Sequence, residues 1–160
     1  MRRVAAVALL ALALSACGWQ LRGTGGAVSL DDRAIHLIDE AGSAELRREV
    51  RAAVEGGGGT VADAAAEADW VLTLHGRGTS RETASVGADG EVRDYRLTYT
   101  LQYSLADGAG ETLLPRQSLD AERTFAAPDS TDARRAREAE LESELRADAV
   151  RLMMLRLQAL

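Results

Sequence analysis

The sequence contains one cysteine, Cys17, and its position predicts a covalent modification. A cysteine thiolate is a nucleophile that a diacylglyceryl donor can alkylate. The small residues before it, in Leu-Ser-Ala-Cys at 14–17, leave room for a peptidase to cut just upstream. Two arginines and an apolar run over 4–14 come first, in the order of a secretory signal. We therefore expect a signal peptide over 1–16 and lipid attachment at Cys17. The alternative is a common signal peptide in which this cysteine is simply a small residue.

The predicted anchor determines how the rest of the chain meets a membrane. The apolar run is too short for a bilayer core, which needs roughly 20 residues. Several acyl chains on Cys17 would hold the protein durably, since each buried CH₂ contributes about 0.8 kcal/mol. Residues 17–31 are polar and glycine-rich, as expected of a lipidated N-terminal tether. Gly18 follows the cysteine, where aspartate would favour retention in the inner membrane, so an outer-membrane location is expected.

Composition predicts one acidic domain over 32–160. The formal net charge is −6, which argues against nucleic acid or a broad anionic surface as a partner. Any anionic ligand would need a local arginine cluster. The two histidines, His36 and His75, are isolated, and no metal-ligand spacing or nucleophile motif accompanies them. We therefore expect no metal, no cofactor and no enzymatic activity.

The first half of this domain predicts a strand and a helix. The apolar run over 34–39 is typical of a buried strand. Ser43 is a good helix N-cap, and Leu46, Val50, Ala53 and Val54 then recur at helical spacing until the glycines over 56–59.

Three strands and a second helix follow. Residues 70–79 alternate, with Trp70, Leu72 and Leu74 on one face and Val71, Thr73, His75 and Arg77 on the other. After a turn at Asp89-Gly90, tyrosine and leucine occupy every second position over 95–105, which predicts a strand with one dry and one polar face. A strand over 112–125 carries Pro115, which favours a sheet edge. The final helix, from Ser130 onward, has an apolar stripe of Leu141, Leu145, Ala149, Leu152 and Leu155, widened by Met153, Leu157 and Leu160.

These elements predict an α+β fold in the order β-α-β-β-β-α. The first crossover should pair two strands in parallel, and the two hairpins should add antiparallel neighbours. The expected result is a two-layer sandwich, with a four-stranded mixed sheet covered on one face by two helices.

Several segments together resemble the lipopolysaccharide-assembly lipoprotein family LptE, also called rare lipoprotein B. They are Cys-Gly-Trp-Gln-Leu-Arg-Gly at 17–23, the strand at 35–39, Glu-Thr-Ala-Ser-Val at 82–86, Tyr95 at the start of the long strand, and the terminal amphipathic helix. The resemblance implies a plug inside the outer-membrane β-barrel LptD. Such a plug aids assembly of the barrel, binds lipopolysaccharide and helps to deliver it to the outer leaflet. It would lie on the periplasmic side of the membrane or within the barrel lumen. The alternative is an accessory outer-membrane lipoprotein of another envelope lipid-transport system.

Binding of a phosphate-rich lipid would need arginines that form paired hydrogen bonds. Candidates are Arg134 and Arg135, near the start of the last helix, and Arg81 and Arg93, in the hairpin region. The alternative for the helix pair is a solvated face, with Glu138 four residues after Arg134. The hairpin tip at 87–90 lacks the cation that is common in the family, so a lipid contact there would depend on Arg93.

Overall fold

The structure is a computed structural model that describes residues 30 and 32–160. Its elements are β1 (Ala34–Asp39), α2 (Ala44–Gly56), β2 (Thr60–Ala62), the short 3₁₀ helix η1 (Ala65–Glu67), β3 (Trp70–Val86), β4 (Val92–Asp107), β5 (Thr112–Ala126) and α3 (Thr131–Leu157). The predicted signal peptide, lipidated cysteine and tether lie outside the described residues.

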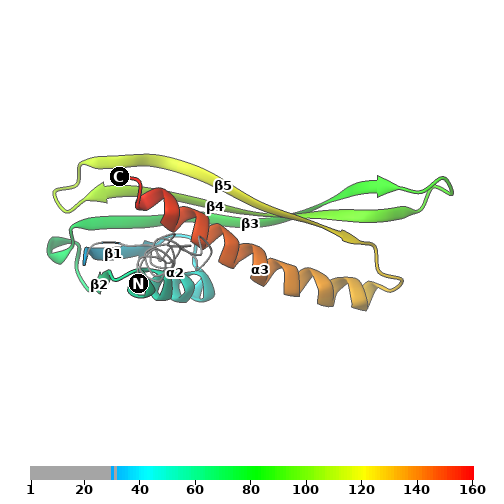
Figure 1. Cartoon of the computed structure of the whole chain (residues 1–160), viewed down its shortest axis with the longest axis horizontal. Helices are drawn as coiled ribbons and strands as arrows, with labels where there is room; N and C mark the ends of the chain where they lie inside the picture. The colour runs from blue at the N-terminus through cyan, green and yellow to red at the C-terminus, as the bar shows by residue number, and fades with distance from the viewer. Residues whose placement is uncertain (1–29, 31) are drawn as a thin grey trace, which may run out of the picture.

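The strands form one mixed sheet in the order β2-β1-β3-β4-β5 (Figure 1). β1 pairs in parallel with β2 and β3, whereas β3, β4 and β5 are antiparallel neighbours. The α+β class, the parallel crossover and the two hairpins are therefore confirmed. The prediction of four strands was wrong, because β2 adds a fifth within the crossover. With only three residues, β2 is too short to show an alternating pattern.

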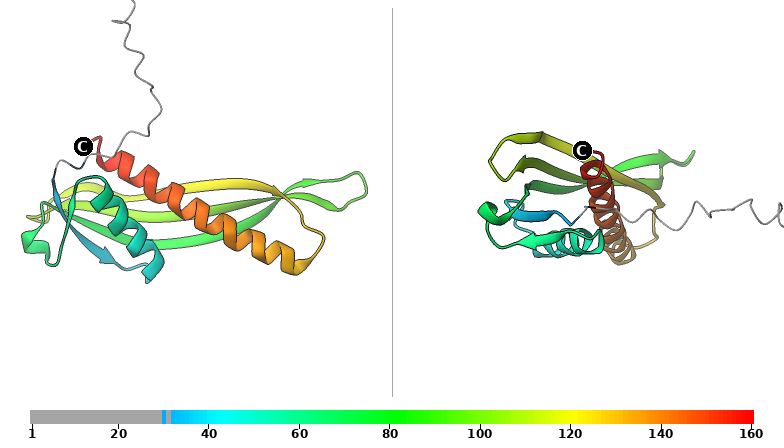
Figure 2. Two further views of the ribbon diagram at one scale, coloured as in Figure 1. Left: turned by 60° about the horizontal axis from the view of Figure 1, so that its bottom comes forward. Right: turned by 60° about the vertical axis from the view of Figure 1, so that its left-hand side comes forward.

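Both helices lie on the same face of the sheet, and the other face is open (Figure 2). The core between the layers contains the alternate residues of β4 that the sequence identified, including Leu101 and Tyr103. The side-chain oxygens of Ser43 and Ser130 accept hydrogen bonds from Leu46 and Ala133, and so cap the first turns of α2 and α3. The caps fix where each helix begins, and the apolar faces decide which side it presents to the sheet.

The buried stripe of α3 differs from the predicted one at its C-terminal end. Leu152 and Leu155 are 38% and 42% exposed, and Leu160 is also exposed. Buried residues instead recur every four positions, at Leu141, Leu145, Ala149, Met153 and Leu157, and Val150 and Met154 join them. Since a helix has 3.6 residues per turn, this spacing moves the buried side gradually around the axis. The shift follows the diagonal course of α3 along the sheet (Figure 1).

A bulge in β3 changes which residues face the helices. The pairing of β3 with β4 shifts by one residue between Leu74 and Gly76. An extra residue in one strand reverses the faces of all residues beyond it. Arg77 therefore lies on the helix-covered side, where its Nη1 is 3.8 Å from Glu142 Oε1 of α3. The expectation that Arg77 shares the face of His75 was wrong for this reason.

The β3–β4 hairpin extends beyond the rest of the sheet. Pairing of β4 with β5 ends at Asp94 and Ala126, but pairing of β3 with β4 continues to Val86 and Val92. A two-stranded ribbon results, and it projects past the start of α3 (Figure 1). Gly90, in the predicted turn at its tip, has φ +83°, a conformation that favours glycine.

Replacing Tyr99 by phenylalanine is expected to leave the domain as stable or to stabilise it by up to about 1 kcal/mol. The buried Tyr99 hydroxyl has no hydrogen-bond partner among the described residues, and an unpaired buried donor costs free energy. Burial also raises the pKa of Tyr99. The unfolded chain would therefore ionise first above about pH 10, and wild-type stability should fall there relative to Tyr99→Phe. Urea unfolding at neutral and alkaline pH tests both effects. If Tyr99→Phe lowered the free energy of unfolding by more than 1 kcal/mol, the prediction would be contradicted.

Candidate binding site

Two of the four candidate arginines meet at the junction of the projecting ribbon and α3. Arg81 of β3 and Arg134 of α3 both approach the ring of Tyr95 in β4, with guanidinium carbons 5.0 and 5.9 Å from its centre. The ring of Phe125 in β5 also lies beside Tyr95, at 5.8 Å between centroids and tilted by 37°. We call Arg81, Tyr95, Arg134 and the nearby Glu138 the arginine–tyrosine cluster.

The arginine–tyrosine cluster has one more positive group than negative groups. Glu138 Oε1 accepts a hydrogen bond of 2.5 Å from Arg81 Nη1 and lies 3.8 Å from Arg134 Nε. The hydrogen bond to Glu138 raises the pKa of Arg81, so this side chain stays charged. Arg134 Nε is buried and has no hydrogen-bond partner among the described residues. Two guanidinium groups thus share one carboxylate, and the surplus positive charge suits an anionic oxygen.

A depression lies beside the arginine–tyrosine cluster. Its volume is about 800 Å³, and it lies between the end of β5 and the first turns of α3. Phe125, which contacts Tyr95, forms part of its wall, and Arg137 lies on its helical side. Ligand sites commonly have volumes of roughly 300–1,000 Å³. The depression therefore has the size of a ligand site, but the four cluster residues do not form its wall.

The other two candidate arginines lie apart from the cluster. Arg93 forms an ion pair with Asp89 at the hairpin tip. The side chain of Arg135 is 74% exposed and its Nη1 is 3.3 Å from Asp132 Oδ1. No pattern in the sequence indicates that Tyr95 and Glu138 lie beside Arg81. Only the register of β3 and the placement of α3 bring these groups together.

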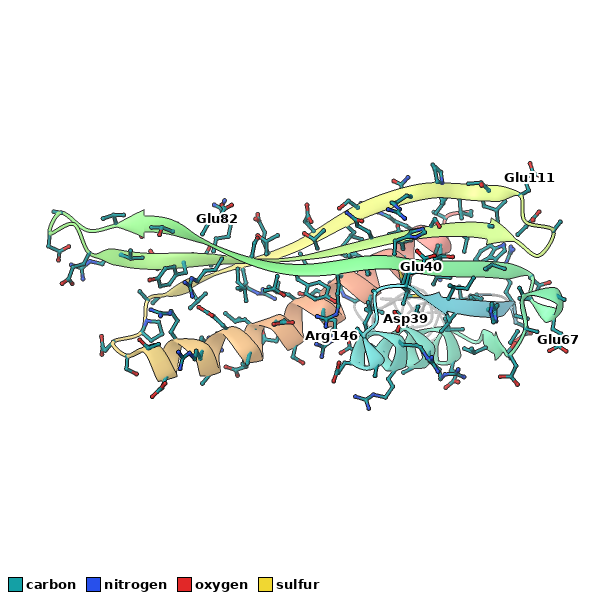
Figure 3. The ribbon with its side chains drawn as sticks, turned by 180° about the vertical axis from the view of Figure 1, so that it is seen from behind. Asp39, Glu40, Glu67, Glu82, Glu111 and Arg146 are labelled. Carbon is teal, nitrogen blue, oxygen red and sulfur yellow. The ribbon has the colours of Figure 1, made fainter. Side chains whose placement is uncertain are left out.

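A second polar network lies on the open face of the sheet. His75 in β3 contacts Glu40, which follows β1, and Ser104 of β4, each at 2.7 Å and through opposite ring nitrogens (Figure 3 labels Glu40). A serine, a histidine and a carboxylate in this order can form a hydrolytic triad. Here, however, the donor-only guanidinium of Arg116 lies 2.9 Å from the same Nδ1 as Glu40, and Ser104 lies within a regular strand. This geometry favours a network that joins strands. Among residues 30 and 32–160, no group of three or more potential metal ligands is found.

Several solved structures that share this fold are named as bacterial lipoproteins. Lipoprotein B from Nitrosomonas europaea has a TM-score of 0.72 at 19% identity, covering 89% of this chain and 91% of its own. The rare lipoprotein B of Shewanella oneidensis has a TM-score of 0.65 at 26% identity, covering 79% and 93%. A minor lipoprotein from Acinetobacter baumannii has a TM-score of 0.66 at 15% identity, covering 80% and 92%. No protein with a curated description matches the chain significantly.

The model of the LptE family, described as lipopolysaccharide-assembly, matches residues 32–157. The chain therefore belongs to the LptE family, and the resemblance seen in its sequence is confirmed. Membership gives it a role in lipopolysaccharide assembly at the cell envelope. In the part of the chain that the structure describes, no helix has both the length and the apolar character needed to span a membrane.

Proposed function

We propose that this protein is an outer-membrane lipoprotein that forms a plug in the β-barrel LptD. Residues 1–16 are removed, Cys17 carries the lipid, and 17–31 tether the domain on the periplasmic side or in the barrel lumen. The plug aids assembly of LptD and the insertion of lipopolysaccharide into the outer leaflet. Family membership over residues 32–157 is the observation that carries the proposal. A sheet with one helix-covered and one polar face supports it, because the lumen of a large barrel is polar.

The arginine–tyrosine cluster is the proposed contact for lipopolysaccharide. Its surplus cation suits a phosphate group, since guanidinium groups bind phosphate oxygens by paired hydrogen bonds and the Arg134 side chain is 26% exposed. The Tyr95 ring holds both guanidinium groups in place through its negative face. Arg93 and Arg135 are secondary candidates, because each already has a carboxylate beside it and neither contacts the cluster.

An affinity pull-down of the tagged full-length protein from outer membranes in mild detergent tests the plug. We expect LptD to be recovered in near-equal amount, as measured by quantitative mass spectrometry. Recovery of only inner-membrane or periplasmic proteins would overturn the proposal. It would favour an accessory lipoprotein of another envelope lipid-transport system. Cys17→Ser, which cannot carry the lipid thioether, controls for recovery that depends only on shared membrane attachment.

A further inference from the structure

Two glycines leave bare backbone at the centre of the open sheet face. Gly76 and Gly78 of β3 pair with Gln102 and Thr100 of β4, whose side chains point away from the helices. A shallow hollow of about 220 Å³ lies over these four residues and Arg77. We call this hollow the glycine window. Glycine in the interior of a strand weakens it, and it often marks a place where another group approaches closely.

Gly78 is not required by the fold of this chain, whereas Gly76 adjoins the bulge in β3, where glycine is common. Both lack the positive φ that favours glycine. A Cβ at Gly78 would meet no atom within 4 Å, and a Cβ at Gly76 would meet only Gln102 Oε1, at an ordinary 3.6 Å. A Cβ at position 78 would therefore fit, and a side chain there would favour strand structure more than glycine does. The described residues thus give no reason for a glycine at this position.

The surroundings of the glycine window disfavour an anionic occupant. Thr100 donates a hydrogen bond of 2.6 Å to Asp120, and Arg96 pairs with Glu122 at 3.7 Å. The carboxylate of Asp120, bonded to Thr100 of the window, would repel the phosphates of lipopolysaccharide, whereas that of Glu122 is paired with Arg96. Sugar recognition usually relies on stacking against aromatic rings, but every aromatic residue in the described part of the chain lies on the helix-covered side of the sheet. The window therefore suits a protein side chain better than a lipid headgroup or a saccharide.

We propose that the glycine window receives an aromatic side chain of the protein partner. A flat ring laid over a strand glycine shields its backbone and compensates for the missing side chain, a device used within sheets. The residues paired with Gly76 and Gly78 in β4 are not aromatic, so this chain does not cover the window from that strand. A tyrosine or tryptophan would also bring an O–H or N–H donor toward Gln102 or Asp120. The inference rests on the proposed function, because it requires a protein partner.

The test fills the window by steps in the full-length lipoprotein. Gly78→Ala and Gly78→Val add increasing bulk, and Ser80→Val adds bulk to the same face two residues away. We expect the amount of β-barrel protein recovered in the pull-down to fall at least fivefold for Gly78→Val and less for Gly78→Ala. Recovery should be unchanged for Ser80→Val. The melting temperature of both Gly78 variants should equal or exceed that of the wild type, so lost recovery would not reflect misfolding.

The possible outcomes separate this inference from the proposed function. Equal recovery by wild type and Gly78→Val would overturn the inference and leave the plug intact. If Ser80→Val reduced the recovery of the β-barrel protein as much as Gly78→Val does, the inference would also be overturned, since the contact would then not be centred on the window. If Gly78→Val still recovered the β-barrel protein but bound lipopolysaccharide more weakly, the window would be a lipid contact instead, and the inference would be overturned. If the wild type recovers no β-barrel protein at all, the proposed function itself is wrong.

Discussion

Replacing both Arg81 and Arg134 by glutamine is expected to weaken lipopolysaccharide binding by roughly 100-fold, and each single replacement by roughly tenfold. A hydrogen bond to a charged group contributes about 1.5–3 kcal/mol, and each 1.4 kcal/mol changes affinity tenfold. The double variant also leaves the Glu138 carboxylate without a cationic partner in the arginine–tyrosine cluster, so an incoming phosphate would be repelled. Titration of the purified protein with lipopolysaccharide, at fixed ionic strength, measures the effect.

Arg77→Gln is the matched control for this prediction. Arg77 lies on the same strand and face as Arg81, and it pairs with Glu142 of α3 as Arg81 pairs with Glu138. It is not among the arginines that contact Tyr95, and the affinity should stay within about twofold of wild type. Equal weakening in Arg77→Gln would show that net charge, and not the cluster, governs binding. If Arg135→Gln weakened lipopolysaccharide binding strongly and Arg81→Gln did not, the binding site would instead lie on the exposed side of α3.

The regular parts of this fold could be predicted because each has a strong local signal. The alternation of tyrosine and leucine over 95–105 identified β4 and its buried face, because a strand buries every second residue. Ser43 and the glycines after residue 55 marked the ends of α2 through capping chemistry. Pro115 correctly indicated an edge strand, since β5 ends the sheet. In each case the decisive interaction lies within a few residues of chain.

The candidate site could be predicted only in part, because its groups meet through long-range packing. Arg81 and Glu138 are 57 positions apart, and only the course of α3 along the sheet brings them together. The bulge near His75 decides that Arg81 faces α3, and its only local signal was Gly76, since an isolated glycine inside a strand suggests a bulge. The candidate arginines were chosen by their charge and their position near the hairpin or the start of the helix. This criterion does not distinguish the two members of the cluster from the two exposed arginines.

Leu145→Ala in α3 is expected to lower the free energy of unfolding by about 3 kcal/mol, whereas Leu155→Ala should change it by less than about 0.5 kcal/mol. Both leucines belonged to the stripe predicted from sequence, but Leu145 is 1% exposed and Leu155 is largely outside the core. Truncating a buried leucine removes its transfer free energy and leaves a cavity, which costs about 2–5 kcal/mol. Urea unfolding followed by circular dichroism measures both values. Similar losses in the two variants would mean that α3 buries a straight stripe. The register of α3 would then be wrong, and with it the position of Arg134 beside Tyr95.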